Sequence, residues 1–226
     1  MKISPNIHKL KPSATLAINE RSAELVAAGK TVYRLGFGQS PFPVPEEVVR
    51  TLQTHAHRKD YLPVRGLPEL RAAVAGFNQR TLGLACTAEQ VLIGPGSKEL
   101  IYDFLLAADA TLLLPAPSWV SYEPQAVLAR KAVHRIETGA ENGWLLSAKA
   151  LREACKAVVG EKVLIINYPG NPTGTSFSPE QLQALAEVAR EHEVLVIADE
   201  IYGEVHHQCQ HQSIATYYPE GTIVSS

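Results

Sequence analysis

The chain has 226 residues, of which 46% are hydrophobic and 19% are charged, and its formal net charge is −2. This composition is typical of a globular protein with one large domain and at most a small appendage, and the charge gives no electrostatic basis for binding nucleic acid or an anionic membrane. Because no apolar run approaches the roughly 20 residues that span a bilayer and no apolar signal segment stands near Met1, we expect a cytoplasmic protein.

The first sixty residues have a different pattern from the rest of the chain. They predict helices near residues 14–29 and 46–57, separated by a loop that is rich in glycine and proline. Pro45 suits the start of the second helix. We interpret residues 1–45 as an arm and part of a small domain, and residues 46–226 as a large domain.

From residue 91 onward, short apolar segments alternate with segments of helical periodicity. Most of the apolar segments are continuous, which is typical of a parallel sheet that helices cover on both faces. One helix has a complete start signal, with Ser178 as the N-cap, Pro179 at the first helical position and Gln181 closing a capping box. The segments that we predict to be strands are residues 91–93, 111–114, 132–136, 163–166, 194–198 and 222–224.

Two polar motifs follow neighbouring predicted strands. Asn171–Gly174 (NPTG) comes after the strand at 163–166, and Asp199–Tyr202 (DEIY) comes directly after the strand at 194–198. With a helix between them, both motifs should lie at the carboxyl ends of parallel strands, where open α/β sheets bind ligands. Asp199 is then either a helix cap or the partner of a buried cation such as a protonated pyridine nitrogen. Tyr202 either packs on the surface or hydrogen-bonds an oxygen of the same ring.

A glycine-rich turn, Gly94–Lys98 (GPGSK), precedes a predicted helix at 98–107. Gly96 lets backbone amides approach an anion, the helix N-terminus favours negative charge, and Ser97 and Lys98 add donors. The turn is not a Walker P-loop, because the GxxxxGK[ST] spacing is absent. It is either a phosphate-binding turn or a plain turn with a capping serine.

An aromatic residue, Trp119, stands just beyond the predicted strand at 111–114. At the carboxyl end of a strand, its flat side chain could stack on a planar ring, although a tryptophan in such a position often serves only packing. The combination of a phosphate-binding turn, a stacking aromatic, an amide, an acid and a phenol at one sheet edge would surround a phosphorylated pyridine. This combination is a stronger argument for a ligand than any single residue.

These segments together resemble the class I/II aminotransferases, which are fold type I enzymes that depend on pyridoxal phosphate. The resemblance runs from about Leu35 to the end of the chain and is most specific in Asn167–Gly174 (NYPGNPTG) and Ala198–Tyr202 (ADEIY). It implies an α/β fold, namely an incomplete fold type I large domain with a mostly parallel sheet and helices on both faces, together with the amino-terminal part of the small domain. Its less specific parts are residues 38–45 (GQSPFPVP), where Ser40 and Pro41 depart from the family's pattern, and residues 61–71 (YLPVRGLPELR).

The resemblance also assigns roles to individual residues. The residues that it places around pyridoxal 5′-phosphate are Gly96, Ser97 and Lys98 at the phosphate, Trp119 on the ring, Asp199 at the ring nitrogen, and Asn171 and Tyr202 at the ring oxygen. The residues that it places near an amino-acid or 2-oxo-acid substrate are Gly38, Asn171 and Trp119. Tyr61 would reach the phosphate site of a neighbouring subunit, so the resemblance implies a homodimer.

The lysine that forms the family's internal Schiff base is missing from the chain. In the family it belongs to an S-x-S-K-like segment just after a strand that resembles residues 222–226, and no lysine here occupies that motif. We therefore expect the amino-terminal portion of a longer aminotransferase, which by itself binds the cofactor weakly at best and has no transaminase turnover. The alternatives are a naturally truncated, non-catalytic relative that binds cofactor or a partner, and a pyridoxal-phosphate-dependent lyase of the same fold.

Other chemistry has less support in the sequence. Residues 206–211 (HHQCQH) lack a second cluster of metal ligands, so we expect a solvent-facing loop and no metal site. No G-x-S-x-G motif is present, which disfavours a hydrolase of the nucleophile-elbow type.

Overall fold

The computed structural model describes residues 2, 4–10, 14–33, 38, 40, 42–205 and 210–226. The chain divides into two compact units, of which one contains Met1–Ile7 with Pro63–Ser226 and the other contains His8–Leu62. The smaller unit holds two helices, α1 (Ala14–Ala27) and α2 (Glu46–His55), close to the ranges that the sequence predicts. Helix α2 begins after Pro45, with two glutamates in its first turn and a histidine in its last, which complements the helix dipole.

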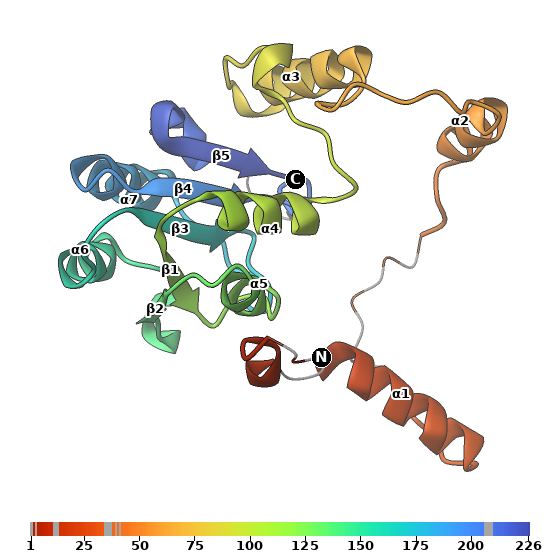
Figure 1. Cartoon of the computed structure of the whole chain (residues 1–226), viewed down its shortest axis with the longest axis horizontal. Helices are drawn as coiled ribbons and strands as arrows, with labels where there is room; N and C mark the ends of the chain where they lie inside the picture. Colours follow the sequence, from red (N-terminus) through yellow and green to blue (C-terminus); the bar gives the residue numbers. More distant parts are fainter. Residues whose placement is uncertain are drawn as a thin grey trace. The chain divides into compact units, whose positions relative to one another are not determined.

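The larger unit is built on a five-stranded sheet (Figure 1). Its strands run parallel to one another in the order β2-β1-β3-β4-β5, which confirms the predicted parallel α/β fold. The strands are β1 (Thr111–Ala116), β2 (Val133–Glu137), β3 (Lys162–Asn167), β4 (Leu195–Asp199) and β5 (Thr222–Ser225).

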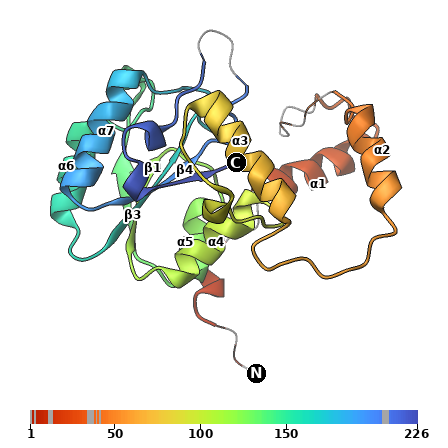
Figure 2. The same ribbon diagram turned by 90° about the horizontal axis from the view of Figure 1, so that it is seen from above.

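Helices cover both faces of this sheet (Figure 2). Helices α4 and α5 pack on one face and helices α6 and α7 on the other, and each face has its own hydrophobic cluster. The helices of the larger unit are α3 (Pro68–Leu82), α4 (Ser97–Ala107), α5 (Tyr122–Leu128), α6 (Ala148–Ala157) and α7 (Pro179–Glu191). Short 3-10 turns lie at Ile7–Lys9, Ala88–Gln90, Ala140–Asn142, Ile214–Thr216 and Pro219–Gly221. Of the described helices, none combines the length and the apolar character that crossing a membrane requires.

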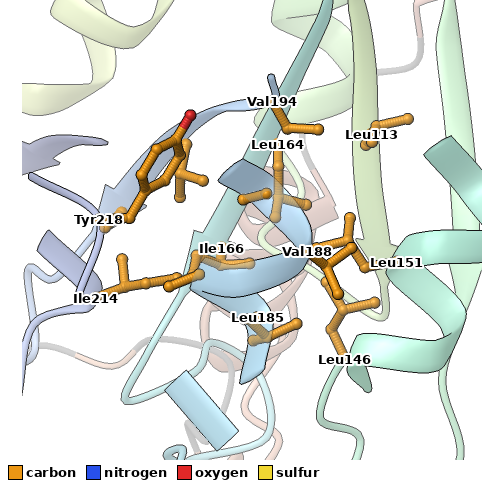
Figure 3. Close-up of a cluster of buried hydrophobic side chains, with 14 of the residues drawn as sticks. Leu113, Leu146, Leu151, Leu164, Ile166, Leu185, Val188, Val194, Ile214 and Tyr218 are labelled. Atoms are coloured by element: carbon orange, nitrogen blue, oxygen red, sulfur yellow. The ribbon is translucent and has the colours of Figure 1, made fainter. Parts of the chain in front are cut away.

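The cluster under α6 and α7 is the larger of the two (Figure 3). Leu164 and Ile166 of β3 point into it, and Leu151 of α6 and Leu185 of α7 meet them there. Each of these side chains is at most 2% exposed, and burying a leucine contributes about 1.5–3 kcal/mol. The continuous apolar pattern of the strands therefore has a direct cause, because both faces of the sheet are buried.

The predicted strand at 91–93 is wrong. The segment has no strand partner among the described residues, and its bond to another segment is from the Ile93 amide to the Arg65 carbonyl, at 3.1 Å. The Leu92 side chain is 55% exposed. An apolar, β-branched run forms a strand only where a neighbour completes its ladder, and this segment lacks one here.

The strand order places a crevice beside β1. Strand β1 pairs with β3 only over Thr111–Leu113, whereas it pairs with β2 as far as Ala116. The chain passes from β1 to β2 on one side of β1 and then crosses to β3, β4 and β5 on the other side. Such a reversal of strand order opens a crevice at the carboxyl ends of the strands, and it is the usual ligand site of open α/β sheets.

Candidate functional site

A pocket occupies the crevice between β1 and β3. The segment after β1 contributes Pro117 and Ser118 to its lining, and the end of β3 and the turn that follows contribute Asn167 and Asn171. Three aromatic side chains, those of Tyr122, Trp144 and Phe177, also line it. The NPTG motif therefore lies at a hollowed carboxyl edge of the sheet, where the sequence predicted it.

Asp199 ends β4 and is buried, with 4% of the residue exposed. Its Oδ2 accepts a hydrogen bond of 2.5 Å from the Tyr122 hydroxyl, and among the described residues its Oδ1 accepts only a longer one, of 3.4 Å, from the Ile201 amide. Within the described part of the chain, Asp199 forms no ion pair. A buried carboxylate with one strong donor and no cation has capacity left for a positively charged ligand.

The protonation of this pair follows from its burial. Burial raises the pKa of Asp199 above its ordinary value, and the hydrogen bond from Tyr122 opposes that rise. Burial, and then the nearby Asp199 charge, raise the pKa of Tyr122 far above the neutral range. The phenol therefore stays protonated and donates, while the acid would gain from a cation at its Oδ1.

Asn167 joins the two sequence motifs. Its Nδ2 donates to the carbonyl oxygen of Asp199 at 2.8 Å, and its Oδ1 accepts from the Asn171 amide at 2.7 Å. The end of β4 and the NPTG turn are thus held by one side chain. Sequence reasoning missed this role, although a polar residue that closes an apolar strand is a signal for it.

The glycine-rich turn before α4 has the features of an anion site. Gly96 is the N-cap, at φ 143° and ψ 152°, and no side chain caps the helix. The first amides of α4 at Ser97 and Lys98 are orphan donors of the kind that anions bind, because the start of an α-helix leaves its amides without intrahelical partners. The turn is fixed from α5, since Gln125 Nε2 donates to the Lys98 carbonyl at 2.6 Å.

Trp119 contacts residues that belong to both parts of the site, Lys98 and Tyr122. Its ring meets that of Tyr122 edge to face, with centroids 5.2 Å apart, and the Lys98 Nζ sits 5.1 Å from the Trp119 ring centroid. Lys98, Trp119, Tyr122 and Asp199 are thus linked by successive contacts, and we refer to these four residues as the row. Sequence reasoning did not single out Tyr122, whose partner stands 77 residues away.

The remaining predicted site residues do not belong to the row. Tyr202 is 38% exposed in the turn after Glu200 and directly follows Ile201, whose amide contacts Asp199. Gly38 and Tyr61 belong to the smaller unit, so the row described above does not include them. Tyr61 is exposed in the single chain. Of the histidine-rich segment, residues 206–209 lie outside the described residues, and the described residues contain no metal-binding group of three or more His, Cys, Asp or Glu side chains.

The residues in the row fit the phosphorylated pyridine that the sequence suggested. The uncapped start of α4 offers amides to a phosphate, and the Oδ1 of Asp199, which accepts only the long hydrogen bond from Ile201 among the described residues, offers a partner to a protonated ring nitrogen. Trp119 contacts Lys98 in the first turn of α4 and Tyr122, the donor to Asp199. The phosphate and the ring nitrogen of such a ligand therefore each have a candidate partner among these residues.

Comparisons with known proteins point to one family. The family described as aminotransferase class I and II matches residues 30–225. The aspartate aminotransferase of Geobacillus stearothermophilus is 35% identical over 97% of this chain and 57% of its own length, and a probable aspartate/prephenate aminotransferase of Thermus aquaticus is 35% identical over 98% and 58%. Among solved structures, the aspartate aminotransferase from Thermus thermophilus with maleate superposes with a TM-score of 0.90 at 32% identity, over 99% of this chain and 59% of that one. The chain spans little more than half the length of the curated relatives that it matches.

Proposed function

The chain belongs to the aminotransferase class I and II family, and on that premise we propose that it carries the cofactor site of a pyridoxal-phosphate-dependent aminotransferase. The reaction would move an amino group between an α-amino acid and a 2-oxo acid. The observation that carries the proposal is the row from the uncapped start of α4, past Trp119, to the half-satisfied carboxylate of Asp199. When bound, pyridoxal phosphate supplies a ring that withdraws electrons from the substrate's α-carbon.

The chain's own residues would bind and orient that ring. Asp199 would hold a proton at the ring nitrogen, and the hydrogen bond from Tyr122 fixes the carboxylate that does so. Gly96, Ser97 and Lys98 would hold the phosphate, and Trp119 would cover the ring. Asn171 and Tyr202 would donate to the ring oxygen.

Three further assignments complete the proposal. Gly38, together with Asn171 and Trp119, would contact the substrate, and Tyr61 would serve the neighbouring subunit of a cytoplasmic homodimer. Residues 1–45 would form an arm and part of a small domain, and residues 46–226 the cofactor-binding large domain. No lysine of the chain occupies the Schiff-base motif, so we expect no transaminase turnover from these 226 residues alone.

Binding of pyridoxamine 5′-phosphate tests the proposal without requiring a lysine, because this ligand has no aldehyde. We expect calorimetric titration of the chain to give an affinity at least about tenfold higher for pyridoxamine 5′-phosphate than for pyridoxamine, since the phosphate contacts the start of α4. Asp199→Asn should lower the affinity for pyridoxamine 5′-phosphate, whereas Asp109→Asn, in the loop before β1, should not. Equal affinity for the two ligands would contradict the proposed site.

A further inference from the structure

A second acid, Glu200, is buried directly beside Asp199. Glu200 is 5% exposed, and its carboxylate accepts hydrogen bonds from three side chains. Its Oε1 receives the hydroxyls of Tyr168 at 2.9 Å and Ser213 at 2.7 Å, and its Oε2 lies 2.9 Å from Nε2 of His211. We refer to Tyr168, Glu200, His211 and Ser213 as the Glu200 cluster.

The cluster anchors the backbone on both sides of Glu200. The Tyr168 hydroxyl accepts from the Ile214 amide at 2.8 Å, and the Ser213 hydroxyl accepts from the Ala215 amide at 3.2 Å. The Glu200 amide donates to the Ser225 carbonyl of β5 at 2.8 Å. The residue after Asp199 is therefore fixed by β5 and by the segment at 211–215.

The two neighbouring acids use opposite faces of the sheet. Asp199 meets Tyr122 in the hydrophobic cluster under α4 and α5, and Glu200 meets Tyr168 in the cluster under α6 and α7. Each carboxylate thus has a buried tyrosine as donor. They differ in that Glu200 has three side-chain donors and Asp199 has one.

The negative charge of Glu200 is incompletely balanced. Its only ion-pair partner among the described residues is His211, whose side chain is 5% exposed. The Nδ1 of that ring is buried and has no hydrogen-bond partner among the described residues. A glutamine could accept the same two hydroxyls at one oxygen but would present an NH2 group to His211, so the acid differs from an amide in that third contact and in its charge.

We propose that Glu200 is a positioning residue of the cofactor site, which fixes the end of β4 and adds a second buried negative charge that favours a ring with a protonated nitrogen. The inference rests on the proposed function, because it acts through the ligand of Asp199. The charge of Glu200 also contributes to the raised pKa of Asp199, after the larger effect of burial. A negative charge on Glu200 would add, from the other face of the sheet, to the effect of Asp199 on a protonated ring nitrogen.

The test compares two ligands that differ in one ring atom. Pyridoxamine 5′-phosphate has a ring nitrogen that can take a proton, and its 1-deaza analogue has a C–H group there. In Glu200→Gln, which keeps the acceptor for Tyr168 and Ser213, we expect the affinity for pyridoxamine 5′-phosphate to fall by roughly fivefold and the affinity for the deaza analogue to stay within about twofold. Glu204→Gln, at an exposed position, should leave both affinities unchanged.

The outcomes separate the inference from the function on which it rests. Equal losses for both ligands, or no loss for either, would overturn the role of the charge. If Asp199→Asn removes the preference for the ring nitrogen and Glu200→Gln does not, the proposed function stands and the inference fails. Absence of phosphate-dependent binding in the unmodified chain overturns both.

Folding is checked by circular dichroism and thermal unfolding of each variant. Should Glu200→Gln not fold, Glu200→Leu combined with Tyr168→Phe and Ser213→Ala supplies a second charge-free variant, since replacing a buried polar cluster by apolar residues is tolerated better than removing one partner from it. The same loss of preference is expected in it, and retention of the preference would overturn the proposal. Ser213→Ala removes one donor but keeps the charge, so it should keep the preference.

Discussion

Helices α4 and α7 both begin after a loop that contains proline and glycine, yet the amides of their first turns differ in their hydrogen bonding. At α7, the Ser178 hydroxyl accepts from the Gln181 amide and Gln181 Oε1 accepts from the Ser178 amide, which closes a capping box. At α4, the N-cap is Gly96, and no side chain caps the helix. The capping box gives the first amides of α7 partners within the chain, whereas the first amides of α4 are left for other partners. Helices α2, α3 and α5 also begin without a side-chain cap, so at α4 the glycine-rich turn and its contact with Trp119 through Lys98 also support an anion site.

The largest effect on stability should come from the core beneath α7. Leu182 is 1% exposed in the cluster that β3 and α7 share, so Leu182→Ala should lower the free energy of unfolding by about 3 kcal/mol through lost burial and a cavity. Urea denaturation measures the loss. The ratio of affinities for pyridoxamine 5′-phosphate and pyridoxamine in the remaining folded protein should not change, and a changed ratio would show that α7 belongs to the ligand site.

A smaller loss of stability is expected at the glycine of α4. Gly96 has a backbone conformation that is open almost only to glycine. Gly96→Ala should therefore lower the free energy of unfolding by about 1–3 kcal/mol, and it should also lower the affinity for the phosphorylated ligand. Gly83, the left-handed C-cap of α3 at φ 67°, is the matched control. Gly83→Ala should lower the melting temperature without changing ligand affinity. A loss of affinity in both variants would mean that general destabilisation causes the effect.

The two helix starts can be compared directly through their serines. Ser178→Ala should cost about 1 kcal/mol, because it removes a formed N-cap bond. Ser97→Ala removes no cap bond and should leave stability within about 0.5 kcal/mol, while it lowers affinity for the phosphorylated ligand. Thermal unfolding measures the stability of both variants, and calorimetric titration measures their affinity for the ligand. A loss of affinity in Ser178→Ala together with a loss of stability in Ser97→Ala would contradict the roles given to the two helices.

The smallest change that we expect is a gain in stability. Because burial raises the pKa of Asp199 in the folded chain, the folded state binds its proton more tightly than the unfolded state does. The charged acid then destabilises the fold as pH rises from the unfolded pKa through the folded one, and the penalty is absent below both. Asp199→Asn should therefore raise the melting temperature of the ligand-free chain at pH 7 more than at pH 3. If Asp199→Asn melted at pH 7 at or below the temperature of the unmodified chain, this would contradict the view that the buried charge of Asp199 destabilises the ligand-free fold.

The sequence predicted much of this fold because the strands are apolar on both faces. It placed Asp199 and Asn171 at one edge, since polar residues that end buried strands are visible in the sequence. It failed at residues 91–93, where an apolar run has no neighbouring strand with which to pair.

The sequence also could not reveal the partners of the site acids. Tyr122 bonds to an acid 77 residues away, and Tyr168 to one 32 residues away. Such pairs arise from packing between strands and leave no local pattern. Local sequence therefore indicated where the site lies, and tertiary contacts determine how its charges are held.

The most direct test of the central claim is the 15N NMR spectrum of pyridoxamine 5′-phosphate, labelled at the ring nitrogen, in the presence of excess chain. At a pH at which the ring nitrogen of the free ligand is neutral, we predict the chemical shift of a protonated ring with the unmodified chain and that of a neutral ring with Asp199→Asn. A neutral ring nitrogen in both complexes would contradict the assignment of Asp199 as its partner.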